Sequence, residues 1–192
     1  IAFFASAAFG QAWSPIAMKI REDDPQNYRA IYGNVFYVLF FSMILISGFL
    51  ALFAGEIIFL LLPGVYSGSA LPLIFLSVGT IFQSTQQITA IGISLAKKTY
   101  LFARIAWIVA LFNFIGNLIL IPSFGINGAA ISTMTSYLLT TVLYFYFTQK
   151  LHPIIIKKGI LAIFSIAAFC IGIVSVIFLN NDINFEMIFL KI

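Results

Sequence analysis

The chain has 192 residues, of which 62% are hydrophobic and only 8% are charged, and its formal net charge is +4. Soluble domains carry about a quarter charged residues, so this composition excludes a soluble enzyme, a nucleic-acid-binding protein and a disordered regulator. The class that fits is an all-α polytopic membrane protein, and we expect a bundle of membrane-spanning helices.

The two ends of the sequence and its cysteine content give the next expectations. The chain begins with Ile1 inside an apolar run and stops at Ile192, so we interpret it as a piece of a longer membrane protein. No basic region precedes the first apolar run, which argues against a signal peptide. Cys170 is the only cysteine, so the chain forms no internal disulfide.

Apolar runs of about 20 residues, the length that crosses a bilayer, predict six spans once clusters of Pro and Gly divide the longer runs. We also expect a short interfacial helix at 56–62, breaks at 63–69 and 122–127, one set of helices over 1–148, and an additional span with a truncated tail over 149–192. The predicted spans are residues 1–18, 32–54, 70–93, 103–121, 128–148 and 159–179.

The basic residues predict an orientation in the membrane. Nine of the ten Lys and Arg residues fall in the loops 19–31, 94–104 and 149–158, and the loops between these contain none. Because basic loops face the cytoplasm, we place these three loops there and the chain in the cell membrane as a multi-pass protein. No loop is long enough for a folded domain, so an ion gradient, the gradient of the substrate or ATP from a partner must drive any transport.

Polar residues inside a span find a partner or line a wet cavity, and the third predicted span carries the most of them on one helical face. We interpret this face as a cavity wall; hydrogen bonding between helices, worth roughly 0.6–2 kcal/mol per contact, is the alternative. The residues are Ser77, Thr80, Gln83, Ser84 and Gln87.

Two other spans contain candidate residues with open interpretations. Pro15 leaves the carbonyl of Gln11 without its helical donor, which predicts either a gating kink or a packing kink. Asn113 and Asn117 share a face with small residues, so they either pack against the next span or line a cavity.

The charged residues limit the chemistry that this stretch performs. No charged residue lies at the centre of a span, so a proton relay is absent from it. Lys19, Arg21 and Arg104 lie near the cytoplasmic ends of spans, where they either meet an anionic headgroup or anchor the topology. The acidic cluster 22–24 is expected to cap the following helix, His152 is interpreted as a solvated loop residue, and we expect no metal site and no cofactor.

A series of short motifs follows in fixed order: AWSP at 12–15, FAGEII at 53–58, GISLAKKT at 92–99 and NFIGNLILIPSFGINGAAISTMTSY at 113–137. In this order they resemble the C-terminal half of polysaccharide biosynthesis flippases. These proteins form the lipid-linked oligosaccharide (O-antigen type) branch of the multidrug/oligosaccharidyl-lipid/polysaccharide exporter superfamily. The resemblance covers nearly the whole chain.

The resemblance implies a fold, an activity and a set of partners. The fold has two six-helix bundles facing each other across a V-shaped cavity, as in MATE-like exporters, and the six spans correspond to helices eight to thirteen. Such a protein is a transporter rather than an enzyme. It moves polyprenyl-diphosphate-linked oligosaccharide across the cytoplasmic membrane by alternating access, with H⁺ or Na⁺ as the coupling cation.

The expected substrate-cavity residues follow from this resemblance and from the polar faces, although Gln11 and Trp13 lie almost opposite each other on their helix. A drug/cation antiporter of the same superfamily, a membrane-embedded glycan polymerase or ligase, and a structural subunit are the alternatives. The candidates are Gln11, Trp13, Pro15, Gln83, Gln87, Asn113 and Asn117 for the cavity, and Lys19, Arg21 and Arg104 for the cytoplasmic mouth.

Overall fold

A computed structural model describes residues 2–156 and 158–180, and it contains helices and no strand over these ranges, which confirms the all-α class. The helices are α1 (Ala2–Asp23), α2 (Tyr28–Leu52), α3 (Ala54–Leu61), the 3₁₀ helix η1 (Gly64–Ser69), α4 (Ala70–Thr89), α5 (Ile91–Leu95), α6 (Tyr100–Phe124), α7 (Ile126–Leu151) and α8 (Lys158–Asn180).

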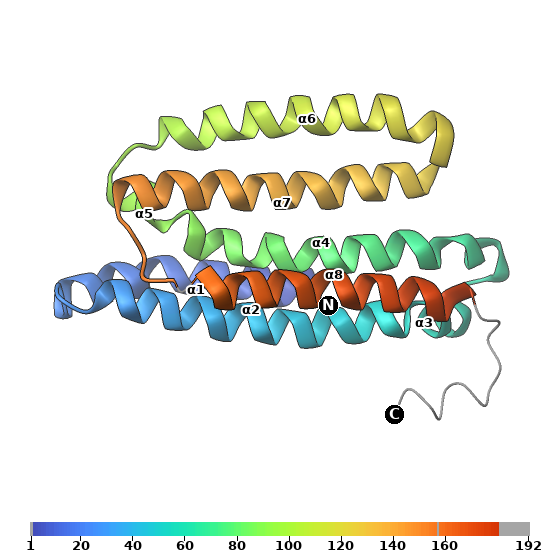
Figure 1. Ribbon diagram of the computed structural model, residues 1–192, viewed down its shortest axis with the longest axis horizontal. Coiled ribbons are helices and arrows are strands. Elements are labelled where there is room, and N and C mark those ends of the chain that lie inside the picture. The colour runs from blue at the N-terminus through green and yellow to red at the C-terminus, as the bar shows by residue number, and fades with distance from the viewer. Residues whose placement is uncertain (1, 157, 181–192) are drawn as a thin grey trace.

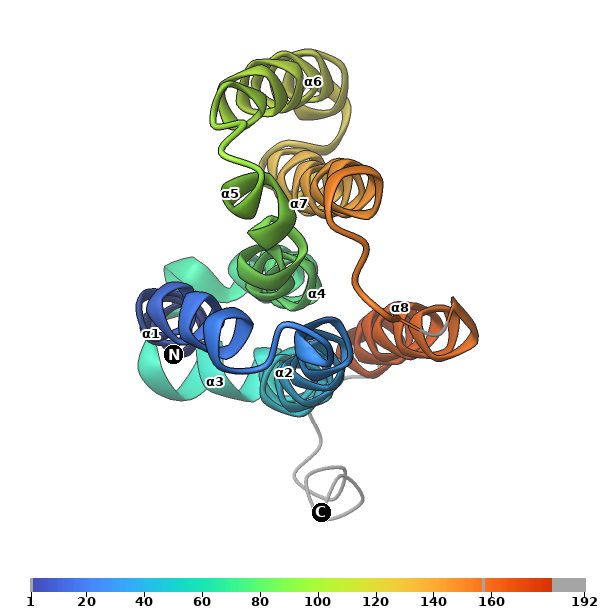
Figure 2. The same cartoon turned by 90° about the vertical axis from the view of Figure 1, so that its left-hand side faces the viewer.

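Helix α4 lies at the centre of the bundle. It packs most extensively against α7 and α2, and it also contacts α1 and α8. Figure 2, which looks along the bundle, shows α1, α2 and α8 on one side of α4, with α7 and then α6 on the other. The bundle therefore has two flanks along α4, one between α1 and α7 and one between α7 and α8.

Small residues let α4 and α5 approach α7 closely. A Cβ atom on Gly79 would lie 3.2 Å from the Cα of Met134, and one on Gly92 would lie 2.6 Å from Cγ2 of Thr148. Membrane helices associate through this kind of close packing, because lipid supplies no hydrophobic force between them.

The core of the bundle is aromatic near the α1–α2 turn. Trp13 packs edge to face on Tyr32 at 5.3 Å between ring centroids, and Tyr28 packs in the same way on Tyr32 at 5.4 Å. Phe36 and Phe40 continue this row along α2, and each is only 2% exposed. These contacts fix α1 against α2 and α4.

Two helices, α2 and α6, are long and apolar enough to cross a membrane among the residues that the structure describes. Only 6% of the most apolar window of α6 is buried, and large side chains such as Trp107 and Ile119 are exposed along it. A helix with so much exposed apolar surface fits a lipid environment. The other four predicted spans fall on α1, α4 with α5, α7 and α8, and none of these helices meets this criterion over its described residues.

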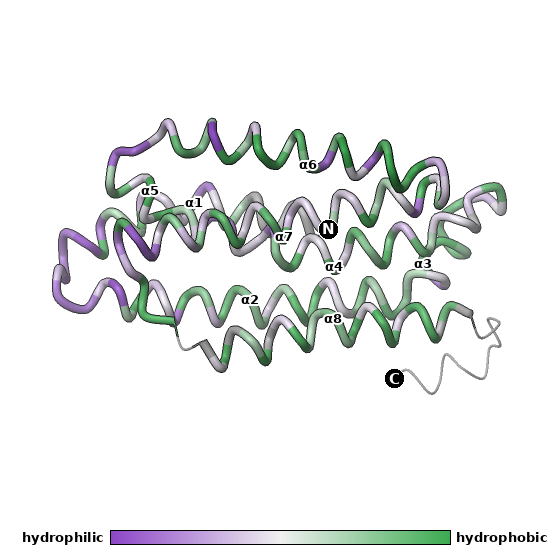
Figure 3. The backbone as a smooth tube through the Cα atoms, turned by 45° about the horizontal axis from the view of Figure 1, so that its top comes forward, coloured by the Kyte–Doolittle hydropathy of each residue, from purple (hydrophilic) through white to green (hydrophobic). Residues whose placement is uncertain are grey.

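The three basic connections lie at the same end of the bundle. The α1–α2 turn, the α5–α6 turn and the α7–α8 linker are all on the left in Figure 1, and the hydrophilic colour concentrates at that end in Figure 3. The α6–α7 turn and α3 lie at the opposite end. This separation of charge is the arrangement that the loop sequences predict.

One predicted break and one predicted span differ from the structure. Pro122 lies inside α6, so the expected break over 122–127 is too long, and the chain reverses at Gly125 alone. Gly125 has φ 55° and ψ −133°, a conformation open to glycine because it has no Cβ. The third predicted span is interrupted at Ala90, where α4 ends and α5 begins one residue later.

Candidate functional site

A polar cavity of about 200 Å³ lies on the flank of α4 that faces α1. Five helices contribute to its wall, and the lining combines amides, hydroxyls and aromatic rings. The lining residues are Trp13, Ser14, Gln86, Gln87, Ala90, Ile91, Ser94, Phe102 and Tyr144.

A second and wider cavity of about 520 Å³ adjoins the first toward the basic end of the bundle. We call the second cavity the basic mouth. Ser94 lines both cavities, so they are neighbours. Two cations and one carboxylate lie in the mouth, which leaves a net charge of +1. The lining residues are Met18, Arg21, Glu22, Pro25, Ser94, Leu95 and Lys97.

The break between α4 and α5 brings Ser94 into both cavities. The N–H of Ala90 donates to the carbonyl of Gln86 over 2.8 Å, which closes α4, and the N–H of Ile93 donates to Ala90 over 3.0 Å, which starts the next turn. The short α5 therefore continues toward the basic end on a new axis. A single straight helix over the predicted span would give Ser94 a different position relative to the two cavities.

Lys97 adopts a left-handed conformation at the end of α5, with φ 55°. This conformation costs a non-glycine residue roughly 1–2 kcal/mol. Backbone hydrogen bonds from Lys97 to Ser94 (3.0 Å) and from Lys98 to Ile93 (3.1 Å) hold the turn. The turn places Lys97 in the wall of the basic mouth.

Two glutamines from neighbouring positions on α4 line the polar cavity. The Nε2 of Gln86 donates to the carbonyl of Tyr137 on α7 over 3.3 Å, which ties this side chain to the cavity wall. Gln87 packs over Gly10 of α1. The two amides therefore sit between α1 and α7.

Trp13 forms the closed side of the polar cavity. Its side chain is 4% exposed, and it stacks on Phe9 at 5.7 Å between ring centroids. Its indole Nε1 is buried without a hydrogen-bond partner in the protein. A buried donor without a partner is costly, so a polar group entering the cavity region has a reason to bind there.

The charged side chains at the basic end of the bundle lie on its surface. No charged side chain is buried among those that the structure describes. In the α1–α2 turn, the backbone N–H and the side-chain amide of Asn27 donate to Asp24 and hold the pKa of its carboxyl group below its ordinary value. The acidic cluster therefore closes this turn through Asp24, whereas the N-cap residue of α2, Asn27, makes no side-chain capping bond.

Three of the predicted site residues come together at these cavities, namely Trp13, Gln87 and Arg21. Gln11 and Pro15 are exposed on α1 and do not line either cavity. Gln83 is half-buried on α4, one turn away from the polar cavity.

Asn113 and Asn117 lie at the contact between α6 and α7. The Nδ2 of Asn113 donates to the hydroxyls of Ser132 (3.2 Å) and Ser136 (3.0 Å), and the hydroxyl of Ser132 donates to the Asn113 carbonyl over 3.0 Å. The Nδ2 of Asn117 donates to Oδ1 of Asn113 over 3.0 Å. The bonds to the serines join α6 to α7, whereas the bond between the two asparagines lies within α6. Neither asparagine lines the polar cavity or the mouth.

Two cations predicted for the cytoplasmic mouth lie outside its lining. Lys19 is exposed on α1, and the guanidinium of Arg104 lies over the ring of Tyr100, 5.0 Å from its centroid. Lys97, which the sequence analysis did not select, lines the mouth, whereas Lys19 and Arg104 do not.

Sequence reasoning did not select several residues that line the polar cavity. Gln86 falls just outside the polar arc of its helix, and Ser14 is adjacent to the selected Trp13 and Pro15. Among the motifs, only the one at 92–99 includes Ser94 of α5. No sequence pattern predicted that Phe102 and Tyr144 line a cavity. The residues are Ser14, Gln86, Ser94, Phe102 and Tyr144.

The part of the chain that the structure describes contains no group of three or more His, Cys, Asp or Glu side chains that could hold a metal ion.

Comparisons with known proteins give one similarity. No protein-family model and no solved structure matches the chain. An uncharacterized membrane protein of Methanocaldococcus jannaschii is 32% identical over 140 residues, which cover 70% of this chain and 28% of the relative. The chain thus spans little more than a quarter of the length of that relative. With the apolar helices α2 and α6, this similarity supports a membrane location for the chain.

Proposed function

We propose that this chain is part of a flippase that moves polyprenyl-diphosphate-linked oligosaccharide across the cytoplasmic membrane by alternating access. The observation that carries the proposal is the polar cavity beside the basic mouth, with Ser94 in the wall of both. A neutral, hydrogen-bonding chamber beside a cationic entrance matches a cargo whose sugars are neutral and whose diphosphate is anionic.

The lining of the polar cavity suits a sugar. Glutamine amides and serine hydroxyls both donate and accept hydrogen bonds, which is what a hydroxyl-rich ring requires. The rings of Trp13, Phe102 and Tyr144 offer apolar surface for the C–H face of a sugar. None of these groups is charged, so the chamber offers no carboxylate to pair with a cationic drug.

The basic mouth suits a phosphate. The guanidinium of Arg21 binds phosphate through two parallel N–H donors, and the ammonium of Lys97 adds a second positive charge. Glu22 lowers the net charge of the mouth, which favours release of the diphosphate after it binds. Ligand sites are typically roughly 300–1,000 Å³. The basic mouth, at about 520 Å³, falls in this range by itself, whereas the polar cavity, at about 200 Å³, is smaller.

The wider architecture of the proposal has six spans, namely α1, α2, α4, α6, α7 and α8, with the basic connections in the cytoplasm. It places α3, which follows α2 at the other end, at the outer surface of the membrane. The polar cavity then lies in the inner half of the bilayer, and the rest of a longer protein faces it.

The test uses the full-length gene deleted in its native host and the sidedness of the lipid-linked oligosaccharide. Complementation with Arg21→Gln or Lys97→Gln is expected to leave complete repeat units on the cytoplasmic face, while the exposed control Lys19→Gln restores surface glycan. Normal surface glycan in the deletion strain contradicts the proposal and favours drug or cation export. Complete units that accumulate on the outer face instead favour a polymerase or ligase.

A further inference from the structure

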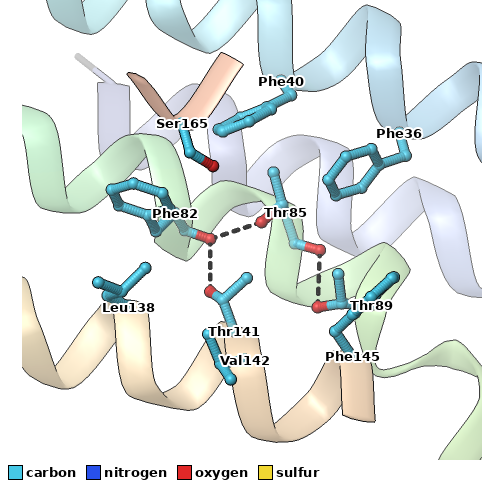
Figure 4. Close-up of a pocket in the computed structure, with 10 residues that line it drawn as sticks. All are labelled: Phe36, Phe40, Phe82, Thr85, Thr89, Leu138, Thr141, Val142, Phe145 and Ser165. Atoms are coloured by element: carbon cyan, nitrogen blue, oxygen red, sulfur yellow. Dashed lines mark hydrogen bonds between the residues drawn. The ribbon is translucent and has the colours of Figure 1, made fainter. Parts of the chain in front are cut away.

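An apolar groove lies on the other flank of α4, between α7 and α8. It has a volume of about 110 Å³, and Figure 4 shows its wall. Helices α7 and α8 pack on α4 rather than on each other, which leaves the groove between them. The lining residues are Phe36, Phe40, Phe82, Thr85, Thr89, Leu138, Thr141, Val142, Phe145 and Ser165.

The threonines of this wall turn their hydroxyls to the backbone. Thr85 and Thr141 both donate to the carbonyl of Phe82, over 2.7 and 2.9 Å, and Thr89 donates to the carbonyl of Thr85 over 3.1 Å (Figure 4). With these hydroxyls occupied, the threonines offer methyl groups to the groove. Apart from the Ser165 hydroxyl, the wall therefore presents hydrocarbon and fits an apolar occupant.

The α7–α8 linker lies at the basic end of the bundle. The N–H of Ile155 donates to the carbonyl of Arg29 at the start of α2 over 3.3 Å, and Gln149 donates to the carbonyl of Ile154 over 2.9 Å. Ile154 is 5% exposed, so the linker is packed down onto the bundle. The exposed side chains of Arg29 and Lys150 lie at this end and give it a positive charge.

The groove and the polar cavity lie on different faces of α4. Phe82, Thr85 and Thr89 face the groove, whereas Gln86 and Gln87 face the cavity. At 3.6 residues per turn the centres of these two faces are roughly 130° apart. A molecule with its headgroup in the polar cavity therefore cannot reach the groove without crossing α4.

We propose that this groove binds one acyl chain of an anionic phospholipid of the surrounding bilayer, with the lipid headgroup beside Arg29 and Lys150. The groove, at about 110 Å³, is smaller than the cavity of about 150 Å³ that binds benzene, so it takes a short stretch of one hydrocarbon chain, and a helix about 10 Å in diameter does not fit. The mostly apolar wall favours a hydrocarbon occupant, and the positive charges of Arg29 and Lys150 at the basic end of the bundle favour an anionic headgroup. The bound lipid fills the space between α7 and α8 and is distinct from the transported cargo.

The test places the full-length protein in nanodiscs that contain phosphatidylglycerol with a diazirine on one acyl chain. After photolysis, mass spectrometry maps the cross-linked residues. We expect labels on the α7 stretch that contains Val142 and Phe145, above the level on the exposed helix α6. Phosphatidylcholine with the same diazirine is expected to label this stretch less, because it lacks the net negative charge.

Val142→Trp places a large ring at the rim of the groove, where Val142 is 53% exposed. Labelling of the groove is expected to fall about tenfold, as for the loss of roughly two buried methylenes. Leu111→Trp on the lipid-facing side of α6 is the matched control and is expected to leave groove labelling unchanged.

Three results overturn the proposal. The first is labelling of α7 that is no higher than labelling of α6 in the unmodified protein. This comparison does not depend on whether a variant folds. The second is groove labelling that persists in a folded Val142→Trp protein. The third is displacement of the probe by polyprenyl phosphate but not by unlabelled phosphatidylglycerol, which assigns the groove to the tail of the cargo.

Discussion

A Cβ atom on Gly10 of α1 would lie 2.8 Å from Cδ of Gln87 on α4. The absence of a side chain at Gly10 is therefore what allows the Gln87 amide to lie across α1 at the edge of the polar cavity. The contact links the packing of two helices to the position of a cavity residue, and it leads to the first prediction.

Gly10→Ala is expected to shift the Gln87 side chain while keeping the fold. Alanine favours the helix by about 0.5–1 kcal/mol over glycine, and the atoms it meets are the end of a flexible side chain, so the free energy of unfolding should change by less than about 1 kcal/mol. Transport by the full-length protein should fall several-fold. Thermal melting and complementation of the deletion strain measure the two effects.

Gly159→Ala in α8 is the control for this substitution, because nothing lies within 4 Å of the new methyl group. By the same helix preference it should raise the free energy of unfolding by no more than about 1 kcal/mol, and it should leave transport unchanged. Full transport by Gly10→Ala would show that the position of Gln87 does not matter to the cargo.

Asn113→Ala is expected to destabilise the α6–α7 hairpin. The substitution removes the two side-chain bonds to Ser132 and Ser136, each worth roughly 0.6–2 kcal/mol in a membrane. Asn117→Ala removes a single bond to Asn113 and should cost less. Unfolding of the purified full-length protein in a denaturing detergent measures the difference. A loss of transport by Asn113→Ala without any loss of stability would instead place this residue in a substrate cavity.

Gly33→Ala is expected to push the α7–α8 linker off α2. The new Cβ would lie 2.1 Å from the carbonyl oxygen of Ile155, a backbone atom that cannot rotate away. Overpacking of this kind costs about 1–3 kcal/mol. A faster tryptic cleavage after Lys150 and a lower melting temperature should report the displaced linker.

The matched control is Gly48→Ala on the same helix, whose new Cβ meets Cδ1 of Ile171 at 3.2 Å. That methyl group ends a flexible side chain and can move, so we expect a smaller loss of stability. Equal melting temperatures for the two variants would mean that the linker does not depend on close contact with α2.

His152 predicts a pH dependence of stability. Its burial beside the linker, reinforced by Arg21 and Arg29, holds the pKa of its imidazole below the ordinary value of 6.5. The unfolded chain then binds a proton more readily than the folded one, so the folded state loses stability as the pH falls below about 6.5. Melting temperatures of the unmodified protein between pH 7.5 and 5.5 should show this fall.

His152→Gln removes the titrating group and should flatten this part of the pH profile. The melting temperatures of the two proteins are compared at the same pH, because the carboxylates titrate in both proteins. Parallel profiles for the two proteins would show that His152 is equally easy to protonate in the folded and unfolded states.

The sequence by itself determined the helices and the distribution of charge. The apolar run at 32–54 corresponds to α2 at Tyr28–Leu52, because the length of an apolar run is a local property that a helix must match. The gathering of the basic loops at one end follows in the same way from the alternation of runs and loops. The class of the fold was therefore available before any contact was known.

Only the tertiary structure decided which polar residues meet in a cavity. A helical wheel gives the direction of Gln83, Gln86 and Gln87 around their own axis, but the neighbour that each direction meets depends on how α1 and α7 pack on α4. Asn113 illustrates the same limit, since its amide bonds to serines more than fifteen residues away on the next helix. The break at Ala90 turned α5 and brought Ser94 and Lys97 to the mouth, and that turn is set by packing against α7 rather than by any local signal.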